Sequence, residues 1–229
     1  MRLNKIKLFR IAVLLLLSTP GVGQNINNKQ LQIRIAPLSL IDPVSSVIQL
    51  GIQKQFNKRL AVAVDYGFKY LSFYDPMDRK DYKYSKTRAE LKYFIKLKNK
   101  SSVTSVSPYL AVEGLYLPQK FRKENEWIFK DQKDYKYEYS NINRQVIVAN
   151  LKFGKEVQIN NNFILDKYIG IGVRKLTITQ NAFGEVESIY DKPVDLPSGS
   201  SLDWRNGIYY RPNILIGFKI AYVLNKKEQ

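Results

Sequence analysis

Apolar and polar side chains alternate in repeated segments along this chain. Successive side chains of a β-strand point to opposite faces, so alternation predicts strands with one apolar face and one polar face. In the clearest segment, 60–72, Leu60, Val62 and Val64 share one face, while Ala63 and Asp65 share the other. Eight segments show the pattern: 30–40, 46–56, 60–72, 85–96, 107–117, 144–156, 163–175 and 208–224.

The connections between these segments alternate in length. Those expected on one side are the compact turns 57–59 and 157–162 and the intermediate connection 97–106. Those expected on the other side are 41–45, 73–84, 118–143 and 176–207, of which all but the first are longer. Bacterial outer-membrane barrels have short periplasmic turns and longer extracellular loops. The pattern therefore predicts an all-β fold, an eight-stranded antiparallel up-and-down transmembrane β-barrel.

The first 23 residues have the layout of a secretory signal peptide. A basic stretch that ends at Arg10 precedes the apolar run Ile11 to Leu17, and Pro20 and Gly21-Val22-Gly23 follow. The apolar run is far shorter than the roughly 18 residues of a membrane-spanning helix, and charged residues interrupt every later apolar stretch. We expect 1–23 to be cleaved and 24–229 to form one barrel domain in the outer membrane of a Gram-negative bacterium.

Charged residues fall on the polar face of the predicted strands. A barrel of eight strands is just wide enough to be filled by its own side chains, and unpaired buried charges are costly. We therefore expect a structural network of paired charges in the lumen, rather than an ion or proton path or an open pore. The expected members are Arg34, Asp65, Arg88, Glu90, Lys92, Glu113, Lys152, Asp166, Arg174 and Lys219.

The chain contains neither histidine nor cysteine. It therefore lacks an imidazole base, a Ser-His dyad, thiolate chemistry and the metal sites built on these side chains. A hydrolase that uses a carboxylate pair needs neither residue, but no spacing of Asp and Glu marks such a pair. We predict a non-enzymatic protein with no catalytic, cofactor or metal site.

The charge balance is strongly basic. The whole chain carries 37 Lys and Arg against 20 Asp and Glu, and without the four basic residues of the leader the net charge is 33 − 20, or +13. No nucleic-acid-binding motif accompanies this charge, so the expected anionic partner is lipopolysaccharide, through its phosphates, together with outer-membrane lipid. We expect a monomer that does not bind nucleic acid.

The two longest predicted outer loops contain aromatic residues suited to a contact surface. Tyr and Trp are favoured in interfaces, so Trp127, Tyr135, Tyr137 and Trp204 are candidates for contact with a surface protein or glycan. The alternative for the 121–139 stretch is that the strands simply continue above the bilayer, with Tyr and Lys at the level of the lipid headgroups.

Four segments suggest a family resemblance. They are "IRIAPLSL" from Ile33, "GIQKQFNKRLAVAVDYGFKY" from Gly51, "PYLAVEGLYL" from Pro108 and "FILDKYIGIGVRKL" from Phe163. They resemble the small outer-membrane barrel proteins of unknown function in Gram-negative bacteria, which are similar in architecture to the OmpA transmembrane domain and OmpX. The resemblance implies a fold and a location, and it implies no catalytic residues.

One other architecture suits the same strands. A soluble periplasmic or secreted barrel that binds a small hydrophobic ligand, as lipocalins do, would also have eight antiparallel strands. It would place the apolar faces inside and the charges outside. The direction in which Val64 and Asp65 point therefore separates the two predictions.

Overall fold

A computed structural model describes residues 31–42, 45–70, 79–95, 106–130, 133–160, 162–187 and 206–224. The predicted signal peptide lies outside these residues. No helix among the described residues is long and apolar enough to cross a membrane.

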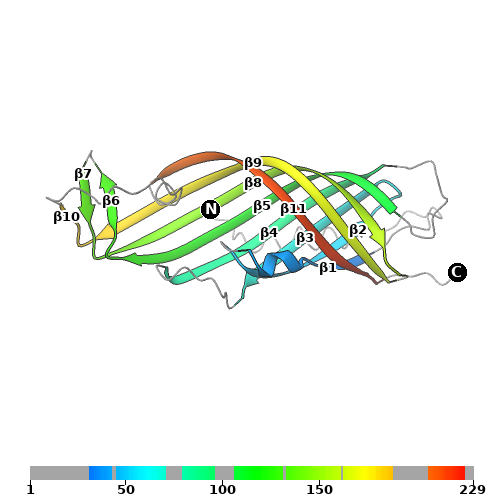
Figure 1. The fold of residues 1–229 in the computed structure, drawn as a ribbon, viewed down its shortest axis with the longest axis horizontal. Helices are drawn as coiled ribbons and strands as arrows, with labels where there is room; N and C mark the ends of the chain where they lie inside the picture. The colour runs from blue at the N-terminus through cyan, green and yellow to red at the C-terminus, as the bar shows by residue number, and fades with distance from the viewer. Residues whose placement is uncertain are drawn as a thin grey trace, which may run out of the picture.

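Eight antiparallel strands form a closed barrel (Figure 1). Each strand pairs with its neighbours in the chain, and the ring closes where the first strand pairs with the last. The strands are β1 (Leu31–Ile35), β2 (Val47–Gln55), β3 (Leu60–Lys69), β4 (Lys80–Phe94), β5 (Val106–Glu124), β8 (Tyr139–Gln158), β9 (Phe163–Phe183) and β11 (Gly207–Val223). All eight predicted strands are present, and the up-and-down order is confirmed.

Asparagine side chains shape two tight turns at one end of the barrel. The Asn57 side-chain oxygen accepts hydrogen bonds from the backbone N–H groups of Arg59 and Leu60, both at 2.8 Å. The Asn160 side-chain oxygen does the same for Asn162 at 2.9 Å and Phe163 at 2.8 Å. These bonds satisfy backbone donors that have no strand partner in the turn.

The first strand is shorter than predicted. It ends at Ile35, and the 3₁₀-helix η1 (Pro37–Leu40) replaces the rest of the predicted segment 30–40. The cause is Pro37, which has no N–H group to donate to a neighbouring strand. The backbone N–H of Ala36 still bonds to the carbonyl of Gln49 at 3.2 Å, and pairing between β1 and β2 stops there.

The 118–143 segment is not one very long loop, and the strands continue into it as the alternative for 121–139 predicted. Most of it is strand, because β5 continues to Glu124 and β8 begins at Tyr139. Between them lies the hairpin β6 (Trp127–Lys130) and β7 (Lys133–Lys136), which forms a small sheet with β10 (Val186–Glu187). Strands β4, β5, β8 and β9 thus project beyond the others towards this hairpin (Figure 1). We call the projecting part the extension.

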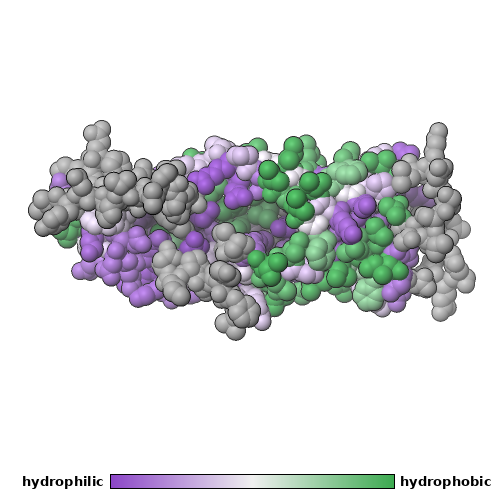
Figure 2. Space-filling model, in the orientation of Figure 1, coloured by the Kyte–Doolittle hydropathy of each residue, from purple (hydrophilic) through white to green (hydrophobic). Residues whose placement is uncertain are grey.

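The two faces of the strands exchange character where the extension begins. Along β8, Ile147 and Leu151 point outward and Lys152 points inward in the barrel body. Farther along the same strand Asn141 is exposed and Ile142 is buried. The alternation keeps its phase, but the apolar side chains move from the outside of the barrel to the inside of the extension. Figure 2 agrees: hydrophobic side chains gather over the middle of the visible face, and hydrophilic ones cover much of the end near β6 and β7.

Candidate functional site

The barrel body encloses an ionic network. At the end with the tight turns, the ammonium group of Lys92 contacts Oε1 of Glu156 and Oδ2 of Asp166, each at 2.7 Å. The hydroxyl of Tyr109 donates to the other oxygen of Asp166 at 2.6 Å, and the amide of Gln53 donates to Glu156 at 2.9 Å. Each carboxylate therefore has both a cation and a neutral donor.

A second cluster lies beside the first and is centred on two carboxylates. Asp65 accepts from Arg34 at 2.7 Å and from Lys219 at 2.9 Å. Glu90 accepts from Lys219 at 3.1 Å, from Lys152 at 2.8 Å and from Arg34 at 3.3 Å. The two carboxylates thus share Arg34 and Lys219, which come from the neighbouring strands β1 and β11, and Glu90 also binds Lys152 from β8.

Lys152 extends this cluster to the next carboxylate. Its ammonium group contacts Glu113 at 3.1 Å and lies 3.8 Å from the ring centroid of Tyr168. Asn150 donates to the other oxygen of Glu113 at 3.0 Å. The network therefore crosses the whole barrel body, and its charged members are buried.

The structure brings eight of the ten predicted lumen residues into these contacts. They are Arg34, Asp65, Glu90, Lys92, Glu113, Lys152, Asp166 and Lys219. The other two, Arg88 and Arg174, lie nearer the extension and form no ion pair with a described carboxylate. Arg174 donates to Asn213 at 2.8 Å, and Nε of Arg88 has no hydrogen-bond partner among the described residues.

Sequence reasoning missed several partners in this network. Glu156 has the same inward phase as Lys152 along β8, so continuing the alternation by two pairs of residues would have found it. Tyr109 and Tyr168 also point inward, but tyrosine is equally common on the lipid face of a barrel. Their position alone therefore gave no signal for a polar role.

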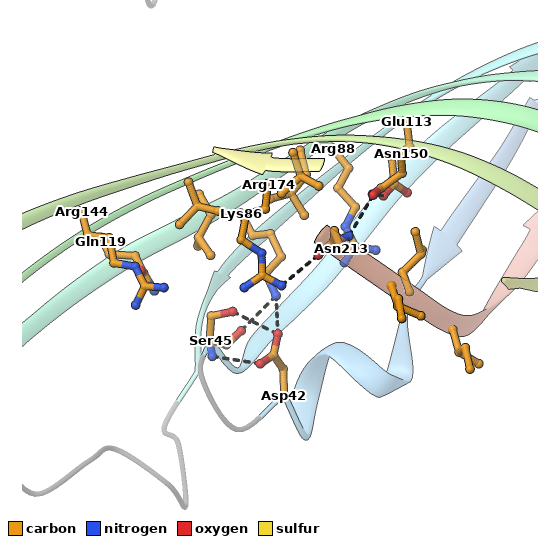
Figure 3. A pocket seen from close by; sticks show the side chains of 17 residues that line it. Asp42, Ser45, Lys86, Arg88, Glu113, Gln119, Arg144, Asn150, Arg174 and Asn213 are labelled. Atoms are coloured by element: carbon orange, nitrogen blue, oxygen red, sulfur yellow. Dashed lines mark hydrogen bonds and ion pairs between the residues drawn. The ribbon is translucent and has the colours of Figure 1, made fainter. Parts of the chain in front are cut away.

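A cavity of about 320 Å³ lies beside the network, towards the extension (Figure 3). Its charged lining consists of Lys86, Arg88, Arg144 and Arg174 against two acids, Asp42 and Glu113. Its apolar lining includes Leu115, Leu117, Val146 and Val148. The cavity lies at the level where the inward face changes from charged to apolar side chains, and this position gives it a mixed wall.

Hydrogen bonds hold the polar side chains of this cavity in place. Lys86 contacts Asp42 at 2.8 Å, and Asp42 also accepts from the backbone N–H of Ser45 at 3.1 Å. On the other side Asn213, which accepts from Arg174, donates to Asn150 at 2.8 Å. Figure 3 shows these hydrogen bonds as dashed lines between the labelled side chains. The polar part of the wall is thus braced by neighbouring side chains.

The extension has an apolar interior of its own. Tyr82, Phe121, Ile142 and Ile178 form a buried cluster. Burial raises the pKa of the Tyr82 hydroxyl, which accepts a hydrogen bond from Gln119 at 2.5 Å. The extension is therefore a packed structure rather than a set of independent loops.

Basic side chains lie on the outer face of the extension. Lys83 and Lys120 lie directly opposite each other on β4 and β5, and Lys80 is opposite Arg122. Lys80 forms an ion pair with Glu124, and this hydrogen bond lowers the pKa of the Glu124 carboxyl.

Three of the four predicted contact residues lie among the described residues. Trp127 on β6 and Tyr135 on β7 are both half-buried. Tyr137 is only 2% exposed, so its side chain is not available for contact as we had predicted. It was misplaced because the segment taken for a loop is folded against the extension. Trp204 lies outside the described residues.

No protein-family model matches the sequence, and no curated protein matches it. The structure is similar to the crystal structure of CarO from Acinetobacter baumannii, with a TM-score of 0.40 and 13% sequence identity. The match covers 87% of this chain and 99% of that chain. A likeness at this level does not bear on function.

Proposed function

We propose that this chain is a non-enzymatic outer-membrane β-barrel with a closed lumen, and that its extension makes contacts at the cell surface. One observation carries the proposal: apolar side chains on every strand of the barrel body point outward and are exposed. One example from each strand, between 45% and 72% exposed, is Ile33, Ile52, Tyr66, Leu91, Val112, Leu151, Ile171 and Ile216. An apolar belt around a barrel with an ionic interior suits a lipid environment and is far larger than the apolar patches on soluble proteins.

Aromatic residues lie towards both edges of this belt. Near the tight turns, Phe163 lies opposite Tyr222, and Tyr93 lies opposite the first residue of β3. Near the extension, Tyr116 and Tyr210 are exposed. Aromatic side chains favour the two membrane interfaces, so their positions support a spanning orientation with the extension on one side of the bilayer.

The lipocalin-like alternative requires the reverse arrangement. Val64 points out of the barrel and Asp65 points into it. Among the described residues, the barrel body encloses paired charges rather than an apolar binding cavity. This orientation favours the membrane barrel over a soluble carrier of hydrophobic ligands.

The ionic network supports a structural rather than a conducting lumen. Arg34, Lys92 and Lys219 are at most 2% exposed, and each contacts carboxylates contributed by other strands. A barrel of this strand number has room for such side chains and little else. The chain has neither histidine nor cysteine, which fits a non-enzymatic protein. The proposed role of the barrel body is to hold the extension at the cell surface.

The outer face of the extension suits lipopolysaccharide as a partner. Like charges directly opposite each other on neighbouring strands are destabilising unless something neutralises them, and Lys83 and Lys120 form such a pair. Lys175 on β9 lies opposite Tyr210 on β11, where the belt ends. Phosphate groups at the level of the headgroups would compensate these ammonium groups.

Nitroxide labels on one strand test the membrane proposal. Because the chain has no cysteine, Leu151→Cys and Asn141→Cys can each be labelled alone in protein reconstituted into lipid vesicles. Both residues point outward from β8, Leu151 in the belt and Asn141 in the extension. We expect the label at Leu151 to be relaxed by oxygen dissolved in lipid and the label at Asn141 by a water-soluble nickel complex. Access of the nickel complex to Leu151 would refute the proposal.

A further inference from the structure

The seam that closes the barrel is paired along only part of its length. Strand β1 pairs with β11 through Ile220 to Val223 only. The remaining length of β11, from Gly207 to Lys219, has no strand partner on that side among the described residues. Helix η1 packs against both β11 and β2 beside the paired part. Among the described residues, the barrel wall is thus interrupted on the side of the seam nearer the extension.

The cavity reaches this interruption. Ile214, Leu215 and Ile216 line it from β11, and Asp42 and Ser45 line it from the chain just beyond η1. The wall at this place consists of a strand edge and a short connecting segment. A molecule could therefore enter the cavity from the side of the barrel.

The side chains on both edges of the interruption are unusually apolar and exposed. The three most exposed large hydrophobic side chains among the described residues are Ile214 at 76%, Ile41 at 74% and Ile216 at 72%. Ile214 and Ile216 lie on β11, and Ile41 directly follows η1. In the proposed orientation these side chains face lipid on both sides of the opening.

The polar part of the cavity has an excess of positive charge. Four cations and two carboxylates line it, which leaves a net charge of +2. The described hydrogen-bond partner of Arg174 is the neutral side chain Asn213. The Nε atom of Arg88 is buried and has no hydrogen-bond partner among the described residues. Guanidinium groups in such a setting favour an anionic ligand with several oxygens.

The rest of the cavity wall is apolar. Leu117, Val146 and Val148 are buried and belong to one hydrophobic cluster. Leu215, on the β11 edge of the interruption, is half-buried. A small inorganic anion would leave these side chains without a partner. A ligand with an oxyanion at one end and a hydrocarbon chain at the other would contact both parts.

We propose that the cavity binds the carboxylate or phosphate head of a single-chain amphiphile, with its hydrocarbon chain leaving through the interruption between β11 and η1. The inference rests on the proposed membrane location, because the chain of the ligand then lies in lipid. Arg88 and Arg174 bind the oxyanion, and Ile41, Ile214 and Ile216 flank the chain where it leaves the barrel.

Binding can be measured with the full mature chain in phosphatidylcholine nanodiscs. The probes are dodecyl phosphate, dodecanoate, dodecyltrimethylammonium and inorganic phosphate, titrated calorimetrically with empty nanodiscs subtracted. We expect one saturable site for dodecyl phosphate or dodecanoate, and no saturable binding of the cationic amphiphile. Saturable binding of inorganic phosphate as tight as that of dodecyl phosphate would show a site for water-soluble anions and overturn the proposal.

Variants locate the site. Arg174→Gln and Arg88→Gln should each weaken binding of the anionic amphiphile at least tenfold, and Arg174→Lys should restore part of it. The control is Lys167→Gln, which lies on β9 with its side chain exposed near the tight turns and should change affinity less than twofold. Equal losses in Lys167→Gln and Arg174→Gln would show adsorption at the membrane surface and would overturn the proposal.

The path of the chain is tested by fluorescence quenching with 12-bromododecyl phosphate. Ile216→Trp places a fluorophore at the interruption, and Leu151→Trp places one in the apolar belt on β8. Quenching, measured relative to the parent protein, should saturate at Ile216→Trp and rise only with bulk partitioning at Leu151→Trp. The same curve at both positions would rule out exit at the seam. The nitroxide experiment would still stand in that case, so failure of this inference is distinguishable from failure of the membrane proposal.

Discussion

Tyr168 lies directly opposite Gly217 across the β9–β11 pair, and its phenol occupies the space that a side chain at position 217 would need. A Cβ atom built on Gly217 would lie 2.5 Å from the tyrosine hydroxyl. Tyr109 and Gly154 repeat the arrangement on β5 and β8, with a corresponding distance of 2.4 Å to the ring. Absence of a side chain at these two glycines thus makes room for the aromatic rings that contact Lys152 and Lys92.

Replacing Gly217 should therefore disturb the ionic network. Gly217→Ala forces Tyr168 away from Lys152, and overpacking of this kind costs about 1–3 kcal/mol. The free energy of unfolding in urea, measured in lipid vesicles, should fall by this amount. Gly114→Ala is the matched control, because a Cβ at Gly114 meets nothing within 4 Å. An equal loss in both variants would mean that the tyrosine contact is not the cause.

Neutralising Glu90 should destabilise the barrel more strongly. Glu90→Gln leaves Arg34, Lys152 and Lys219 close together without the carboxylate they share, and breaking one partner from a buried pair costs about 3–5 kcal/mol. Urea unfolding again provides the measurement. Glu124→Gln, which removes an acid from an exposed ion pair in the extension, should change the stability little. A Glu90→Gln variant as stable as the parent would show that this carboxylate does not stabilise the network.

The parent protein should not conduct ions. Buried side chains of the network span the lumen from Lys92 to Lys152, so planar bilayers containing the protein are expected to show no steady current. Glu90→Gln should also remain closed, because the side chain keeps its volume. A reproducible single-channel conductance from the unmodified chain would contradict the filled interior.

Binding to lipopolysaccharide should depend on the basic side chains Lys83 and Lys120 on the outer face of the extension. Lys83→Gln combined with Lys120→Gln should weaken binding of the reconstituted protein to lipopolysaccharide by about 1 kcal/mol for each lysine removed, and high salt should reduce the difference. Lys155→Gln, near the tight turns, serves as the control and should have no effect. A loss that is equally large in Lys155→Gln would point to non-specific attraction by the net positive charge.

The barrel body could be predicted because one physical rule governs all its strands. A single alternation, with apolar side chains outward and polar ones inward, identifies both Leu151 and Lys152 on β8. The extension obeys the opposite rule: Ile142 is buried and Asn141 is exposed. The local alternation does not show where the medium outside the strand changes from lipid to water, so the sequence left both a loop and continued strands open for 121–139.

The cavity could not be predicted for a different reason. Pro37 signals that β1 stops early, but the consequence depends on whether another strand takes its place beside β11. That is a property of the closed ring rather than of the segment around Pro37. Arg88 and Arg174 line the cavity from the inward face, whereas the hydrogen bond from Arg174 to Asn213 depends on how β9 and β11 pair.

The reversal of the two faces along β8 sets how deeply the proposed barrel can sit in a bilayer. Sinking by one pair of residues would bring Gln145 towards hydrocarbon, and a further pair would bring Asn143. Rising by the same amount would lift Leu151 and Phe153 towards water. Either displacement would move side chains on all the long strands into the less favourable medium at once. The extension therefore stands at a constant height above the lipid. A molecule that diffuses along the membrane surface would therefore always meet the same level of the protein.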